Sequence, residues 1–284
     1  MRARARAFAG VMTKAVTAWF DDNASSLGAA LAFYTIFSVA PILIIAVAIA
    51  GYVFGADTAQ TEVLAQLQAL TGDAGATAIR QLLASAQYSD KKGIAAAIGI
   101  VTLVVGATSV FGELQNALNR IWRTPPQPKS VGWWRFVRAR VLSVGMVMGV
   151  GFLLLVSLLV SAALAAFGGW LGSFLPQFDI VLPIADLLVS FGMTVLLFAL
   201  IYRYVPGESI PWGDVWTGAT VTALLFTIGK HLIGVYLGKS SFNSAYGAAG
   251  SIIILLLWIY YSAQIFLLGA EFTRVFAYEY GSRS

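Results

Sequence analysis

The sequence predicts an all-α membrane protein: a polytopic bundle of about six transmembrane helices with amphipathic helices on its surface. Three observations lead to this fold class. Of the 284 residues, 59% are hydrophobic and only 11% are charged, whereas a soluble domain has about 25% charged residues. The mean hydropathy is +0.81. The apolar residues also gather in long runs, several of which reach the ~20 residues that a helix needs to cross a bilayer.

The composition limits the chemistry that this chain can perform. Cysteine is absent and there is a single histidine, His231. We therefore expect no disulfide, no metal site, no cofactor and no enzymatic activity. The net charge of +5 is interpreted as topological rather than as a sign of nucleic-acid binding, because lysine and arginine gather in the cytoplasmic loops of membrane proteins.

We expect residues 1–284 to form one transmembrane domain. Residues 1–26 are predicted to be a basic amphipathic helix on the cytoplasmic membrane surface, with a frayed basic tail as the alternative. Residues 55–92 are predicted to be an extracytoplasmic loop that carries short amphipathic helices. The expected membrane spans are residues 27–54, 93–111, 141–167, 181–204, 213–237 and 247–275.

The first span has Pro41 near its middle. Proline donates no backbone hydrogen bond, so the helix is expected to kink there. Tyr34 and Ser38 lie one turn apart close to the carbonyl that this leaves free. A kink with nearby hydroxyl groups is tolerated in a membrane when it lines a cavity; a packing kink that Ser38 itself satisfies is the alternative.

The helix of the second span is expected to continue to residue 122. Glu113, Asn116 and Arg120 share one face of it, and Asn119 lies beside them. Three arginines follow beside tryptophans before the third span, which is typical of an interfacial anchor or of a site for anionic lipid headgroups. They are Arg135, Arg138 and Arg140. Small-residue pairs such as Gly145 and Gly149 indicate helix packing, either within the chain or in a homo-oligomer.

Asp186 and Lys230 fall within the fourth and fifth spans. If these spans are antiparallel neighbours, the two side chains reach a similar depth. Ionisable groups inside a membrane usually pair or line a water path. The sequence therefore predicts that Asp186 and Lys230 form an intramembrane ion pair.

The last span carries a polar stripe, because Tyr261, Gln264 and Glu271 recur at spacings of three and seven residues. Burial disfavours the charged form of a carboxylate, so Glu271 is the candidate for coupling to protons or ions. The alternative is a salt bridge at the cytoplasmic end of the helix. Its expected partners are Arg274, Arg120 or Arg123.

Basic residues concentrate in the N-terminal segment, in the loops at 112–140 and 203–212, and at the C-terminal end. This asymmetry predicts that both termini are cytoplasmic.

Three motifs resemble a known family. They are AFYTIFSVAP at residues 32–41, GATSVFGELQNALNRIW at 106–122 and YGAAGSIIILLLWIYYSAQIFLLGAEFTRV at 246–275. The chain resembles the YihY/BrkB family of bacterial inner-membrane proteins, formerly called ribonuclease BN. This resemblance implies a six-helix membrane core, a location in the inner membrane and a transporter-like role with no named substrate. The polar motif positions that it carries over are Tyr34, Ser38, Asn119, Tyr246, Tyr261, Gln264 and Glu271.

The favoured function is a permease that moves an unidentified small solute through a polar intramembrane cavity. The expected cavity residues are Tyr34, Ser38, Pro41, Glu113, Asn116, Asn119, Tyr261, Gln264 and Glu271. The alternative is a protein of the envelope that handles lipid or serves as a scaffold, with anionic lipids as partners. A ribonuclease is disfavoured, because metal-dependent phosphoryl chemistry needs clustered carboxylates or histidines.

Overall fold

The computed structural model of the chain describes residues 2–37, 109–125, 178–239 and 248–283, with single positions between 55 and 80. All regular structure in these residues is helical, which confirms the all-α fold class. Among the described residues, three helices are long and apolar enough to cross a membrane: Leu187–Tyr204, Trp212–Leu237 and Ile252–Glu279. The expected spans 93–111 and 141–167, and the loop 55–92, lie wholly or largely outside the described residues.

The described helices follow one another from the basic N-terminus to the C-terminal end. The labelled ones are α1 (Arg2–Asp21), α6 (Phe178–Tyr204), α7 (Trp212–Lys239) and α9 (Ala248–Glu279). Two further helices cover Ala24–Phe37 and residues 109–121.

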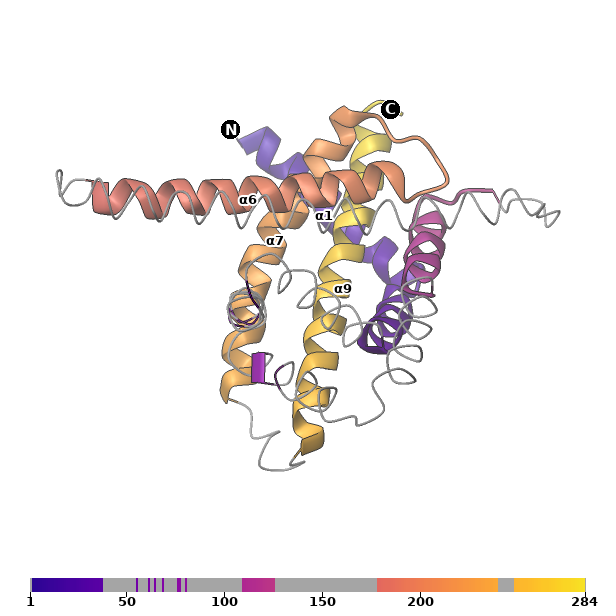
Figure 1. Ribbon diagram of the computed structural model, residues 1–284. Helices are drawn as coiled ribbons and strands as arrows, with labels where there is room; N and C mark the ends of the chain where they lie inside the picture. Colours follow the sequence, from indigo (N-terminus) through magenta and orange to yellow (C-terminus); the bar gives the residue numbers. More distant parts are fainter. Residues whose placement is uncertain are drawn as a thin grey trace.

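The helices α7 and α9 run side by side in opposite directions, and α6 crosses them near one end (Figure 1). Both chain termini lie at this same end of the molecule. The crossing of α6 differs from the antiparallel arrangement with α7 that the sequence analysis assumed. It explains why, among the described side chains of α6, the buried ones lie in the C-terminal half, while Leu187 and Leu188 are exposed.

Small residues bring α7 and α9 into close contact. A Cβ atom at Gly218 would lie 1.8 Å from Oγ1 of Thr273, and one at Gly269 would lie 2.0 Å from Oγ1 of Thr222. Each helix thus places a glycine opposite a threonine of the other, four residues apart in both sequences. The Thr222 hydroxyl donates to the Gly218 carbonyl at 2.7 Å, and Thr273 donates to Gly269 at 2.7 Å. The hydroxyl groups of both threonines thus have an acceptor within their own helix.

The third helix of this core, α6, is joined to the other two through Tyr202. This side chain is fully buried. Its hydroxyl donates to the Phe266 carbonyl at 2.8 Å and lies 3.0 Å from Oγ1 of Thr222. Around it, one cluster of buried apolar residues includes side chains of α6, α7, α9 and the helices 24–37 and 109–121.

A sharp turn separates α1 from the helix Ala24–Phe37. Asn23 has a φ of 52°, a left-handed conformation that asparagine tolerates better than most residues. Its carbonyl accepts the backbone N–H of Ser26 at 3.0 Å, so it also starts the following helix. The apolar face of α1 packs on α9, where Val11 and Ala15 are buried against Phe272.

The helix 109–121 ends in a Schellman motif. Arg123 has a φ of 51° and donates its N–H to the Arg120 carbonyl, while Thr124 donates to the Asn119 carbonyl at 2.9 Å. Pro125 follows and cannot continue the helix.

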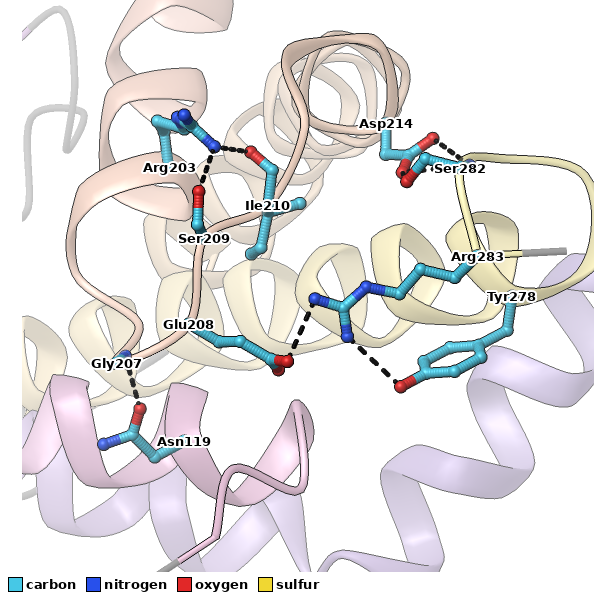
Figure 2. A network of polar contacts seen from close by, with 10 residues as sticks. All are labelled: Asn119, Arg203, Gly207, Glu208, Ser209, Ile210, Asp214, Tyr278, Ser282 and Arg283. Carbon is cyan, nitrogen blue, oxygen red and sulfur yellow. Dashed lines mark hydrogen bonds and ion pairs between the residues drawn. The ribbon is translucent and has the colours of Figure 1, made fainter. Parts of the chain in front are cut away.

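The C-terminal residues fold back onto the α6–α7 connection, as Figure 2 shows. Asp214, in the first turn of α7, accepts a 2.5 Å hydrogen bond from the Ser282 hydroxyl. Arg283 forms an ion pair with Glu208 at 3.1 Å and lies 5.4 Å from the centroid of the buried Trp122 ring. We call Glu208, Asp214, Ser282 and Arg283 the C-terminal clasp. It closes one end of the bundle.

We expect Gly269→Ala to lower the free energy of unfolding by about 1–3 kcal/mol, because the added methyl group overpacks the interface. The nearest atoms belong to Thr222 and Tyr202, whose hydrogen bonds prevent them from moving aside. The matched control is Gly234→Ala on α7, where nothing lies within 4 Å of the added atom. Thermal unfolding in detergent checks this, and equal stabilities of the two variants would contradict the packing argument.

Candidate functional site

The candidate site is built around Glu271, whose side chain is fully buried in α9. Arg274, one turn later, contacts a single oxygen of this carboxylate. Its Nη2 lies 3.0 Å from Oε2 of Glu271, and its Nε donates to the same oxygen at 3.2 Å. The salt bridge that the sequence analysis offered as the alternative for Glu271 is therefore present, with Arg274 as the partner. The other oxygen, Oε1, is left to find a partner elsewhere.

A second carboxyl group faces Glu271 from the turn after α1. The Asp22 side chain lies within hydrogen-bonding reach of Glu271. Oδ2 of Asp22 and Oε1 of Glu271 are both buried, and no donor among the described residues reaches either atom. Two carboxylates only accept hydrogen bonds, so this contact becomes a hydrogen bond only when one of them carries a proton. We call Asp22, Glu271 and Arg274 the carboxyl site.

Gln264 lies two turns before Glu271 on the same face of α9. Its Nε2 reaches the Ser25 carbonyl at 3.4 Å, which is long for a hydrogen bond. A Cβ atom at Gly28 would lie 2.0 Å from this nitrogen, so the helix Ala24–Phe37 packs tightly on it. Its Oε1 is buried without a donor from the described part of the chain. The α9 face toward residues 22–28 thus buries two side-chain oxygens that no described donor reaches.

Tyr261 belongs to a different interface. A Cβ atom at Gly229 of α7 would lie 3.1 Å from Cε1 of Tyr261. The stripe predicted along α9 is therefore divided: Tyr261 faces α7, whereas Gln264 and Glu271 face the N-terminal helices.

The polar residues of the helix 109–121 lie at a third place. Asn119 accepts the Gly207 N–H with its side-chain oxygen at 2.7 Å, which fixes the α6–α7 connection (Figure 2). Glu113 is partly buried and Asn116 is exposed. These contacts do not bring Asn119 together with Glu271.

The remaining predicted residues are only partly described. Tyr34 is 38% exposed and its ring lies 5.6 Å from that of Phe33. Lys230 is partly buried on α7, but the side chain of Asp186 lies outside the described residues, so their ion pair stays a prediction. The other positions outside the described residues are Ser38, Pro41, Arg135, Arg138, Arg140 and Tyr246.

A pocket of about 360 Å³ lies beside the carboxyl site, between α1 and α9. The exposed Lys14 amine pairs there with Glu279, and this hydrogen bond raises the pKa of Lys14 above its usual value. Arg274 lines the pocket, and its guanidinium binds Glu271. It therefore connects the pocket to the buried carboxylates. The other polar residues along the pocket are Thr17, Asp21 and Tyr278.

Sequence reasoning missed Asp22 as a partner of Glu271. The sequence analysis included Asp22 only as part of the amphipathic segment 1–26 and assigned it no role of its own. Spacing along the chain gives no sign of this contact, because Asp22 and Glu271 are far apart in the sequence. The sequence analysis also did not predict the Gly–Thr contacts of α7 and α9, although both Gly–Thr pairs have the four-residue spacing noted for Gly145 and Gly149.

Comparisons with known proteins place the chain among membrane proteins. The profile of the family described as "Virulence factor BrkB" matches residues 15–284. A UPF0761 membrane protein of Cronobacter sakazakii is 31% identical over 258 residues, covering 89% of this chain and 83% of its own length. One from Stenotrophomonas maltophilia is 31% identical over 265 residues, which cover 89% of this chain but 57% of its own length. No solved structure matches the chain.

We expect Gln264→Met to raise the free energy of unfolding by about 1 kcal/mol, because methionine fills a similar volume and removes a buried oxygen that lacks a donor. The control is Gln115→Met. Its amide donates to the Val205 carbonyl at 3.3 Å, so that variant is expected to lose stability. Unfolding of the purified variants in detergent measures both. A clear loss of stability in Gln264→Met would show that the Ser25 contact outweighs the unsatisfied oxygen.

Proposed function

The chain belongs to the virulence factor BrkB family, and from that premise we propose that this integral membrane protein is a permease for a small solute. The observation that carries the proposal is the face of α9 toward residues 22–28. Gln264 and Glu271 each bury an oxygen there without a donor from the described residues, within a helix long and apolar enough to span a membrane. Such groups are expensive in a bilayer and usually mark a path for ions or substrates.

In this proposal no residue is catalytic, and no metal or cofactor takes part. Glu271 is the coupling residue, because it is the buried carboxylate of the polar face and contacts ionisable groups of two elements, Asp22 and Arg274. Tyr261 and Asn119, at other interfaces, act as packing and positioning residues in this proposal.

We place the protein in the bacterial inner membrane, with both termini in the cytoplasm. Two observations support this orientation. Both termini lie at one end of the molecule (Figure 1), and basic residues concentrate in the segments on that side. Aromatic side chains mark the same level. Tyr204, Trp212 and Trp216 are exposed, and the Arg203 guanidinium lies 5.7 Å from the Trp212 ring centroid, as is typical of a membrane–water interface.

A lipid-handling or scaffold role is the second candidate. The observation that favours it is the pocket between α1 and α9, which carries Lys14 and Arg274 at the same end as the aromatic residues. Against it, both cations are already paired with glutamates. An anionic headgroup would therefore have to displace at least one of them.

A thermal-shift screen of the detergent-purified protein tests the permease. The probes are small organic solutes, inorganic anions and anionic lipids, each with wild type, Glu271→Gln and the control Glu208→Gln. A solute present at 100 times its Kd would stabilise the wild type by about 2.7 kcal/mol. We expect a soluble probe to stabilise the wild type and Glu208→Gln, but not Glu271→Gln.

Stabilisation by anionic lipids alone, equal in all three proteins, would contradict the permease and favour the second candidate. Glu208 is a suitable control because it is a half-exposed carboxylate paired with Arg283. Its substitution removes one negative charge, as Glu271→Gln does, but at a place outside the polar face of α9.

A further inference from the structure

Among the described residues, the carboxyl site has one negative charge more than its neighbours balance. Asp22 and Glu271 bring two carboxyl groups into contact, and Arg274 supplies one positive charge. The guanidinium is committed to Oε2 of Glu271. Oε1 of Glu271 and Oδ2 of Asp22 are buried and lack a donor among the described residues. An unpaired charge in such a place costs several kcal/mol, so the geometry calls for one further positive charge between these two oxygens.

A proton fits this gap better than a metal ion does. It needs only two oxygens within hydrogen-bond distance, which the contact supplies. Calcium takes six to eight oxygen ligands and magnesium about six. In the described part of the chain, no group of three or more histidine, cysteine, aspartate or glutamate side chains is placed so that it could hold a metal ion. The Gln264 amide, the nearest other polar side chain of this face, is turned to the Ser25 carbonyl.

We propose that Asp22 and Glu271 bind one proton between them at neutral pH, and that this shared proton fastens the turn after α1 to α9. With the proton bound, one acid donates to the other carboxylate and both orphaned oxygens are satisfied. Without it, two negative oxygens are in contact beside a single guanidinium. Their repulsion then favours separation of the turn from α9.

The turn is built so that such a separation would move a whole element. Asn23 breaks the helix directly after Asp22, so α1 and the helix Ala24–Phe37 are distinct rods that meet at this point. Residues of α1 just before the turn, Ala18 and Asp21, line the pocket opposite Arg274. If Asp22 separates from Glu271, the side of this pocket that α1 forms is therefore loosened next to the turn.

Among the described residues, the charged groups that act on Glu271 come from two elements. From α9, Arg274 acts directly on Glu271, and Asp22 acts from the turn after α1. The next charge along α1 is the exposed Asp21, which lines the pocket. Lys14 and Glu279 are bound to each other. From the helix Ala24–Phe37 the printed contact to this face is the uncharged Ser25 carbonyl.

This inference deepens the proposed function, since a solute would be coupled to this proton, but the proton site can be tested without any solute. The experiment measures the unfolding temperature of the full-length protein in detergent as a function of pH. The variants are Glu271→Gln and Asp22→Asn, each the amide analogue of a protonated acid, with Glu208→Gln as the control.

A proton held by the folded protein and not by the unfolded chain makes stability fall as pH rises, because the unfolded state then binds fewer protons. We expect the unfolding temperature of the wild type and of Glu208→Gln to fall across neutral pH, by roughly 3 to 5 °C per pH unit for one proton. Both amide variants are expected to show a flat profile there, because the amide N–H replaces the proton permanently.

Coincident profiles for wild type and the two amide variants would overturn the proposal. Failure of both amide variants to fold would overturn it as well, since neutral analogues should suit a site that already holds a proton. Infrared spectroscopy of the wild type gives an independent reading: the C=O band of a protonated carboxylic acid is expected at neutral pH and its absence refutes the shared proton. If the solute screen gives no hits but the pH profile is as expected, the permease proposal is contradicted and the proton site is supported.

Discussion

The close approach of α7 and α9 is the contact on which the rest of the described structure depends. Neither helix could come this near with a larger side chain at Gly218 or Gly269, because the opposing threonines already occupy the space. Lipid offers no hydrophobic gain for helix association, so tight van der Waals packing and satisfied hydroxyl groups must supply the attraction. Once the pair is formed, Tyr202 can reach both Thr222 and the Phe266 carbonyl, which fixes where α6 crosses.

The same packing determines which faces of α9 remain for other partners. With one face covered by α7, the side chains of Gln264 and Glu271 meet the turn and helix that follow α1. At this interface α1 packs on α9, and the helix Ala24–Phe37 contacts Gln264. The C-terminal clasp closes the end of the bundle nearby, through Asp214 and Arg283. The buried acids are therefore enclosed by elements from both ends of the chain.

A buried acid pair beside one arginine is a poor means of stabilising a fold, since an apolar pair of similar volume would avoid the desolvation cost. The proposed permease and the proposed shared proton would account for that cost, because a group whose charge changes at a helix junction can link protonation to the position of α1. The pocket between α1 and α9 is the part of the described structure that such a movement would alter first.

Composition and hydropathy alone determined that this is an all-α membrane protein, because the bilayer forces long apolar runs to form helices. The motifs also sufficed for the family, which the match over residues 15–284 confirms. The helical periodicity of α9 marked Gln264 and Glu271 as exceptional. Only the tertiary structure decided their partners. The contact of Glu271 with Asp22, the separation of Tyr261 from the other two residues, and the crossing of α6 over α7 all depend on how distant helices rotate and pack against one another. A periodic pattern shows which residues share a face, but not which helix that face meets.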